Sequence, residues 1–441
     1  MWVQEQIMEF IAHIPATVKV LMIFATVVVL MKYKIRLGLT LFMGAFVMGL
    51  WFQKPVLKTL EGMGLSCIEF RTLSLIILIA MLLTLSRSMK EAGSMTRMVR
   101  HVRKLSGSQV TAMAMLPAII GLIPMPGGAV FSCPMVEEAA QEIDTRNSLK
   151  TVINYWCRHC WEYWWPLYPG VILAVTLVKI DIEQFIAGMI PLTMVHLTGA
   201  YLFLLRPLSQ KNTHVHHSPQ ISHLNAFLLE ITPILIIVAS ILVLGNTMRL
   251  FVKVSEANQE NLKHLPFAIG LVIAIVYVCA SAKLPVRTVT NCVFSRDTWT
   301  LVFDVAGVMA FAGMLERSAA VEQIKTEFIA WNIPLLPVVM LLPFLAGLVT
   351  GLAIGFVGAS FPLVISLLPD NLAWQSMIKY IVIAYGFGYI GMMLSPVHIC
   401  FILTRDYFKT PINTAYRHLL LPVVFLGCGI LLLALVWHVA T

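Results

Sequence analysis

The residues Leu122-Ile-Pro-Met-Pro-Gly-Gly-Ala-Val-Phe-Ser-Cys-Pro-Met-Val136 decide how this chain folds, because they interrupt two apolar runs. Proline removes a backbone hydrogen-bond donor and glycine removes the side chain, so a continuous helix through Pro124, Gly127 and Gly128 is unfavourable. Inside a membrane, non-helical backbone is tolerated only where protein buries it or where it lines a water-filled cavity. The break therefore indicates a binding site within a membrane protein.

The composition on both sides of this break is that of a membrane protein. Of the 441 residues, 59% are hydrophobic and only 12% are charged, about half the charged share of a soluble domain. Apolar runs of roughly 20 residues, long enough to cross a bilayer as a helix, recur along the chain. No polar stretch is long enough to form a soluble domain. The sequence therefore predicts an all-α polytopic membrane protein.

The net charge of +9 is explained by membrane topology and not by nucleic acid binding. Basic residues gather in alternate loops, such as 32–36 and 87–104, as cytoplasmic flanks do. We therefore predict a multi-pass protein of the bacterial inner membrane with both termini outside and no nucleic acid partner. The eight cysteines are interpreted as small packing residues. The His-rich segment 214–217 is interpreted as a solvated linker, and no metal site is predicted.

The two arms around the break, 110–123 and 129–142, are each too short to span a hydrocarbon core of about 30 Å. They predict a re-entrant hairpin. A second glycine-rich break, 347–362, lies within the apolar segments at 335–368. Its residues Gly358-Ala-Ser-Phe-Pro362 match Gly128-Ala-Val-Phe-Ser-Cys-Pro134, which predicts a second hairpin.

Each half of the chain then contains five crossings and one hairpin, and an odd number of crossings inverts the second half. We predict a first repeat at 1–206, a cytoplasmic linker at 207–224 and a second, inverted repeat at 225–441. The total is about ten transmembrane helices plus two re-entrant hairpins. Inverted repeats with paired broken segments are typical of secondary transporters.

A cluster of charges lies inside the crossing that follows the first hairpin. Arg158 is expected roughly 13 Å from the cytoplasmic end of this helix, and Glu162 is one turn further on. Arg158 is a candidate bidentate donor to an anionic group, with Glu162 or His159 carrying a coupling proton. The alternative is that Arg158 and Glu162 form a structural ion pair.

The matching crossing in the second half carries no charge at that level. Carbonyl groups freed around Ser395-Pro396 are candidate Na⁺ ligands, and His398 either titrates or packs by hydrogen bonding. Asp304 is a lone carboxylate within an apolar run. It is either an ion or proton site or the partner of a backbone or hydroxyl donor.

At the two hairpin tips, helix N-termini direct free N–H groups into the membrane. The predicted substrate-binding residues are Pro126, Gly127, Gly128, Ser132, Asn154, Arg158, His159, Gly355, Gly358, Ser360, Ser395 and His398. The predicted coupling residues are Glu162, Asp304 and His159. The expected partners are a small anionic substrate, the lipid bilayer and a coupling Na⁺ or H⁺, with no other cofactor.

Three functions fit these residues. The first is a symporter for a small anion, and the second is a cation/proton antiporter that uses Asp304, Glu162 and His159. The third is an intramembrane enzyme, for which Ser132, Ser360, Cys157 and His159 offer single groups but no catalytic spacing such as His-Glu-x-x-His. We therefore expect a transporter and not an enzyme.

Three motifs carry a resemblance over essentially the whole chain. They are Pro124-Met-Pro-Gly-Gly-Ala-Val-Phe-Ser132, Arg158-His-x-x-Glu-Tyr-x-x-Pro-Leu-Tyr-Pro169, and Ser395-Pro-Val-His398 with Thr404-Arg-Asp-Tyr407. The chain resembles the permease-like family called domain of unknown function 401, of the ion-transporter superfamily. Similar proteins include divalent-anion/sodium symporters, gluconate permeases, arsenite exporters and sodium/proton antiporters. The resemblance implies two re-entrant hairpins with substrate at their tips, elevator-like alternating access and a homodimer.

Overall fold

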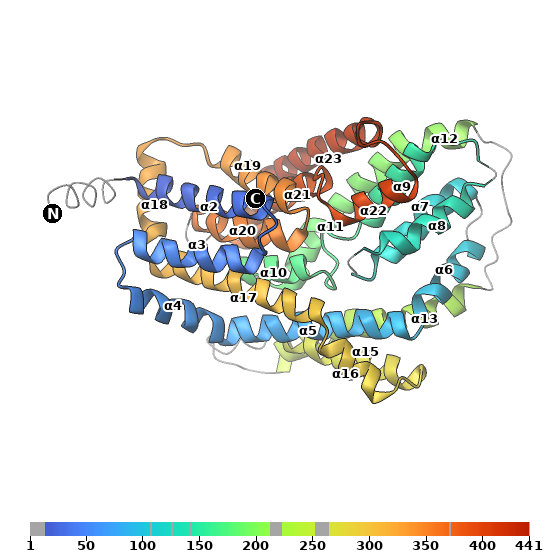
Figure 1. Cartoon of the computed structure of the whole chain (residues 1–441), viewed down its shortest axis with the longest axis horizontal. Helices are drawn as coiled ribbons and strands as arrows, with labels where there is room; N and C mark the ends of the chain where they lie inside the picture. Colours follow the sequence, from blue (N-terminus) through green and yellow to red (C-terminus); the bar gives the residue numbers. More distant parts are fainter. Residues whose placement is uncertain are drawn as a thin grey trace.

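The computed structural model describes residues 14–105, 108–124, 127–141, 143–211, 223–251, 264–369 and 372–440, and every secondary-structure element within these ranges is a helix (Figure 1). Pro126 and the His-rich segment 214–217 lie outside the described residues. Within these described ranges, six stretches are long and apolar enough to cross a membrane: Phe70–Glu91, Ile182–Gln210, His223–Met248, Val286–Arg317, Trp374–Met393 and Ile412–Val439. The all-α polytopic class predicted from the sequence is confirmed.

The first half of the chain contains both long and short helices. In chain order they are α2 (Ala16–Lys32), α3 (Leu37–Trp51), α4 (Val56–Ile68), α5 (Phe70–Glu91), α6 (Ser94–Leu105), α7 (Gln109–Gly121), α8 (Ala129–Ala139), α9 (Asn147–Arg158), α10 (Pro169–Val178), α11 (Ile182–Ala200), η1 (Tyr201–Leu205) and α12 (Arg206–Lys211). Helix α6 occupies most of the basic segment 87–104, which is predicted as a loop, and α4 is a second short helix.

The second half follows the same order. Its helices are α13 (His223–Phe251), α15 (Leu265–Ser281), α16 (Val286–Val293), α17 (Arg296–Arg317), α18 (Ala320–Ala330), α19 (Leu335–Thr350), α20 (Ala353–Ser366), α21 (Trp374–Met393), α22 (Ile399–Tyr407) and α23 (Ile412–Ala440). The predicted arms of both hairpins appear as α7 with α8 and as α19 with α20. At 1.5 Å per residue the arms are about 17 to 24 Å long, shorter than the hydrocarbon core.

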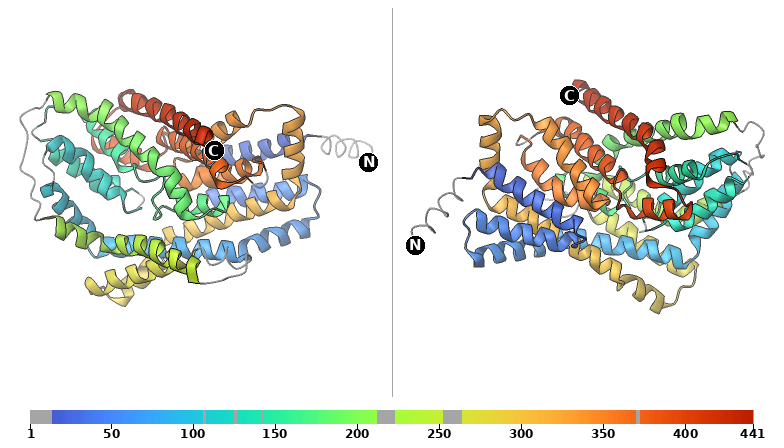
Figure 2. Two further views of the ribbon diagram at one scale, coloured as in Figure 1. Left: turned by 180° about the vertical axis from the view of Figure 1, so that it is seen from behind. Right: turned by 45° about the horizontal axis from the view of Figure 1, so that its top comes forward.

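Corresponding helices of the two halves pack across to each other. Helix α3 of the first half packs on α17 of the second half, and α15 of the second half packs on α5 of the first half (Figure 1). Helix α10 packs on α20 of the second hairpin, and α22 packs on α8 of the first hairpin. Figure 2 shows the first hairpin beside α9 and α22, at the opposite end of the molecule from α2, α3 and α18.

Ion pairs connect α5 and α17 in a reciprocal way. Arg87 near the end of α5 pairs with Asp297 at the start of α17, with 2.5 Å between Nη2 and Oδ2. Arg317 at the end of α17 pairs with Glu69, which immediately precedes α5. All four side chains are partly exposed, so these pairs contribute little stability. They show that α5 and α17 lie side by side and run antiparallel.

Candidate functional site

Two broken helices meet at the candidate site. Helix α9 ends at Arg158 and α10 begins at Pro169, whereas α21 ends at Met393 and α22 begins at Ile399. Pro169 is the first residue of α10, where its missing backbone donor is tolerated, and Pro396 lies inside the second break. The backbone of 159–168 and 394–398 makes separate turn hydrogen bonds, such as His159 N to Trp156 O and Ser395 N to Met392 O, in place of a continuous helical ladder.

Tyrosine hydroxyls satisfy much of this freed backbone. They donate to carbonyl oxygens across the site: Tyr155 to Met393 at 3.0 Å, Tyr385 to Glu162 at 2.7 Å and Tyr389 to His159 at 3.0 Å. Tyr155 and Tyr385 lie 230 residues apart in the sequence, and each binds the break in the other half. Both tyrosines are fully buried. Their hydroxyls supply hydrogen bonds that water provides elsewhere and that lipid cannot.

Aromatic side chains of the first break also hold the end of α7. They donate to its last carbonyl oxygens: Trp161 to Ala118 at 2.8 Å, Tyr168 to Gly121 at 2.5 Å and Trp165 to Leu122 at 2.9 Å. Carbonyl groups of a final helical turn have no partner within the helix. The unwound segment thus attaches directly to the tip of the first hairpin.

Three metal-ligating side chains converge between the two breaks. One ligand atom each from His159, His398 and Cys400 lies within 4.8 Å of the others, and all three residues are buried. Glu162 joins the cluster, with Oε1 3.8 Å from His159 Nε2. The ring of Tyr155 packs edge-on against both histidine rings, at centroid distances of 5.0 and 5.2 Å. The structure therefore brings together His159, Glu162 and His398 as candidate site residues.

Arg158 and Asn154 lie one helical turn apart on α9, and both are buried. Asn154 Nδ2 donates to Thr404 Oγ1 on α22 at 3.0 Å and to Cys133 Sγ on α8 at 3.2 Å. Its Oδ1 is buried and has no hydrogen-bond partner among the described residues. Asn154 therefore ties the first hairpin to both broken helices and keeps an acceptor available for a ligand.

Close packing of α7 against α9 depends on a glycine. A Cβ atom at Gly121 would lie 2.0 Å from the carbonyl oxygen of Arg158, a distance that no side chain tolerates. This contact sets the position of Arg158 relative to the hairpin tip, where Gly127 adopts a positive φ of 69° and Gly128 is the N-cap of α8.

The hairpin serines form hydrogen bonds within their own helices. Ser132 Oγ donates to Ala129 O at 3.4 Å, and Ser360 Oγ donates to Phe356 O at 2.6 Å. In the second hairpin, Cβ atoms at Gly355 and Gly358 would come within 2.5 Å of Thr350 and 2.4 Å of Val308, respectively. These two glycines allow close helix packing.

Ser395 and Asp304 have distinct local roles. Ser395 is fully buried in the second break, and its Oγ accepts a hydrogen bond from Val397 N at 3.4 Å. Asp304 Oδ1 accepts a hydrogen bond from Gly38 N at 2.7 Å, in the first turn of α3. Of the two interpretations of Asp304, the structure shows the backbone partner.

Cys400 and the three tyrosines were missed by the sequence interpretation. Cys400 follows His398 by two residues, and this His-x-Cys spacing at a helix break was a usable signal. Tyr385 and Tyr389 occupy one face of α21 at a four-residue spacing, directly before the break. Aromatic residues in an apolar run look like packing residues, so their role as backbone donors emerged only with the tertiary contacts.

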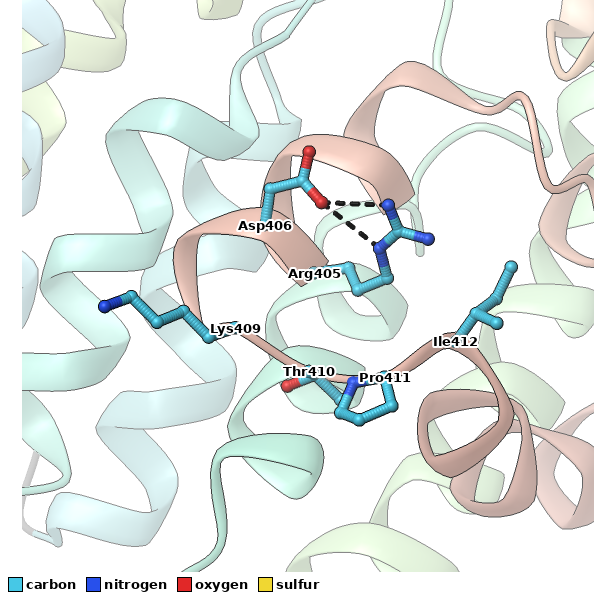
Figure 3. Close-up of a pocket in the computed structure, with 6 residues that line it drawn as sticks. All are labelled: Arg405, Asp406, Lys409, Thr410, Pro411 and Ile412. Carbon is cyan, nitrogen blue, oxygen red and sulfur yellow. Dashed lines mark hydrogen bonds and ion pairs between the residues drawn. The ribbon is translucent and has the colours of Figure 1, made fainter.

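A surface pocket lies at the far end of α22 from His398 (Figure 3). Its lining residues are Arg405, Asp406, Lys409, Thr410, Pro411 and Ile412. Arg405 donates to Asp406 Oδ1 at 2.9 Å, and Thr410 Oγ1 shares a hydrogen bond with Thr151 on α9 at 2.8 Å. The pocket thus borders both broken helices and carries charged groups outside the buried cluster.

The fold is similar to that of a solved membrane protein. The matching structure is described as the Alcanivorax borkumensis YdaH transporter with an unusual topology, at a TM-score of 0.57 and 14% sequence identity. The match covers 86% of this chain and 88% of the transporter. Curated protein sequences gave no match. Residues 16–440 match the family described as protein of unknown function DUF401, and the chain belongs to that family.

Proposed function

We propose that this membrane protein is a secondary active transporter for a small anion, in particular an organic carboxylate, coupled to Na⁺ or H⁺. The observation that carries the proposal is the buried Arg158 at the junction of two broken helices and a short hairpin. The similarity of the fold to a solved transporter supports the class. The proposed setting is the bacterial inner membrane, with both termini outside and two chains forming a homodimer.

Arg158 is the main candidate for substrate recognition. Its planar guanidinium matches the two oxygens of a carboxylate, and a buried charge is retained at a high desolvation cost. Asn154 lies one turn away, where its Oδ1 can accept a hydrogen bond from a hydroxyl group of the substrate. The N-terminus of α8, at the adjacent hairpin tip, offers N–H donors to the carboxylate. Together they offer a positively charged site with polar groups that orient the ligand.

An inverted repeat with elevator-like alternating access is the mechanism we propose. The reciprocal bonds of Tyr155 and Tyr385 and the reciprocal ion pairs of α5 and α17 support a two-fold relation between 1–206 and 225–441. In this mechanism the hairpins and broken helices move together and carry the ligand, and 207–224 is a cytoplasmic linker.

Uptake into proteoliposomes tests the anion proposal. We expect accumulation of at least one member of a carboxylate panel under an imposed Na⁺ or pH gradient. Arg158→Lys keeps the charge but loses the bidentate geometry, so uptake should fall by about 10- to 100-fold, as for a lost hydrogen bond to a charged group. Arg317→Lys, at a surface ion pair, is the matched control. Wild-type protein that moves no anion under either gradient would contradict the proposal.

A cation/proton antiporter is the second candidate, favoured by the proximity of His159 and Glu162. In that case a pH-sensitive dye inside the vesicles would respond to added Na⁺ without any anion. Asp304→Asn separates the roles of this carboxylate, because asparagine still accepts from Gly38 N but cannot exchange a proton. Under the anion proposal we expect no dye response and normal uptake by Asp304→Asn.

A further inference from the structure

We propose that His159, His398 and Cys400, together with Glu162, bind a divalent d-block cation such as Zn²⁺ between the two helix breaks. This site goes beyond the proposed transport of an anion with Na⁺ or H⁺, and it rests on different groups from Arg158 and Asn154. Imidazole, thiolate and carboxylate are the ligands that Zn²⁺ and Co²⁺ prefer, whereas Na⁺ and Mg²⁺ prefer oxygen ligands alone.

Both histidine rings are oriented as metal ligands are. His159 Nδ1 lies 2.6 Å from Tyr155 O, and His398 Nδ1 lies 3.3 Å from Met392 O. A backbone carbonyl oxygen at Nδ1 requires the proton there and leaves the lone pair on Nε2. The two rings stand perpendicular at a centroid distance of 4.8 Å, and one ligand nitrogen of each ring lies within 4.8 Å of the other and of Cys400 Sγ.

Another buried histidine, His196, has a ring that serves only in packing, and it can be compared with His159 and His398. His196 places Nε2 3.0 Å from Trp156 O and Nδ1 3.1 Å from the Tyr163 hydroxyl. Both of its ring nitrogens are thus used for packing. In His159 and His398, by contrast, one nitrogen is held by the backbone and the other faces the cluster.

The spacing of the ligand atoms fits a site that closes around an ion. Zn–N bonds of about 2.1 Å and Zn–S bonds of about 2.3 Å place tetrahedral ligand atoms about 3.3 to 3.7 Å apart. The three ligand atoms lie within 4.8 Å of one another, so side-chain movements of about 1 Å complete the geometry. Glu162 Oε1, 3.8 Å from His159 Nε2, is placed as the fourth ligand. Binding releases the thiol proton of Cys400.

Direct metal binding to the purified full-length chain tests this site. The protein is prepared without a polyhistidine tag and titrated with Co²⁺, then with Zn²⁺ in competition. We expect one ion per chain, with a thiolate-to-cobalt charge-transfer band that Zn²⁺ removes. X-ray absorption of the Zn²⁺ form should show one sulfur and two imidazoles, and this measurement requires no variant. A shell of nitrogen and oxygen alone would overturn the proposal.

Matched variants separate this cluster from other buried residues. Cys400→Ser should abolish the charge-transfer band, and His398→Gln should weaken Zn²⁺ binding by more than about 100-fold, since loss of a partner outside the ligand shell already costs 10- to 100-fold. Cys157→Ser, at another buried cysteine, should change neither property. Unchanged Co²⁺ spectra and affinity in both cluster variants would overturn the site. Because binding is measured without transport, a failure here is distinct from a failure of the anion proposal.

Discussion

Single tyrosine hydroxyl groups bind the backbone at the breaks in the two broken helices. Tyr385 is fully buried, and its hydroxyl donates to the carbonyl oxygen of Glu162, inside the break between α9 and α10. Tyr155 makes the corresponding bond to Met393. A carbonyl group that loses its partner in this environment has no water to replace it. The hydroxyls therefore determine how stable the unwound backbone is.

Tyr385→Phe should lower the free energy of unfolding by about 1 to 3 kcal/mol, the cost of leaving one buried acceptor unsatisfied. Denaturant unfolding in mixed micelles measures this change. Tyr33→Phe is the control, because Tyr33 is 73% exposed and should lose no stability. Equal stability of Tyr385→Phe and wild type would show that the Glu162 carbonyl has another partner.

At the residue scale, the sequence identified charged groups better than it identified their partners. Arg158, His159 and Glu162 stand out because charge is rare in an apolar helix, and His159 and Glu162 do lie together. Cys400 did not stand out, because cysteine is common in buried apolar segments. Its relation to His159 depends on a contact across about half the chain, which no local pattern encodes.

At the scale of elements, the second hairpin depends on one glycine. Gly351 ends α19 with a positive φ of 62° and begins the turn into α20. A Cβ atom there would lie 2.9 Å from both the Cα and the N of His398. The turn therefore requires glycine for its backbone conformation and also for its close approach to the second break.

Gly351→Ala should destabilise the protein by more than about 2 kcal/mol, because the left-handed conformation alone costs an alanine about 1 to 2 kcal/mol and the clash adds to it. The substitution should also reduce uptake, since it displaces His398. Gly64→Ala is the control: Gly64 lies within α4, and a Cβ atom added there would have no neighbour within 4 Å, so alanine should stabilise that helix by about 0.5 to 1 kcal/mol. Similar unfolding curves for the two variants would contradict this role of Gly351.

Element boundaries were predictable where proline, glycine and arm length were decisive. The arms of both hairpins follow from Pro124, the adjacent glycines and apolar runs too short to span a bilayer. The short helices α4, α6, α16 and α18 were not predicted, because charged residues interrupt their apolar pattern, as they do in a loop. Helix α6, for example, is held by packing on α13 and by an ion pair between Arg97 and Glu230.

At the scale of the whole molecule, the two halves of the chain have prolines at matching positions. Pro55 is the N-cap of α4 and Pro285 is the N-cap of α16, and these residues occupy matching places 230 residues apart. If the second repeat is inverted, the two loops lie on opposite sides of the membrane. Two repeats with parallel orientation would instead place both loops on the same side.

Cysteine labelling of Pro55→Cys and Pro285→Cys measures this orientation. Both positions are exposed, and both backbones have φ near −60°, which cysteine adopts without strain. With both termini outside, an impermeant maleimide should label Pro55→Cys in intact spheroplasts and Pro285→Cys only after lysis. Wild-type protein gives the background from native cysteines such as the exposed Cys428. Labelling of both variants from the same side would rule out the inverted repeat, and with it the alternating-access mechanism that we derive from it.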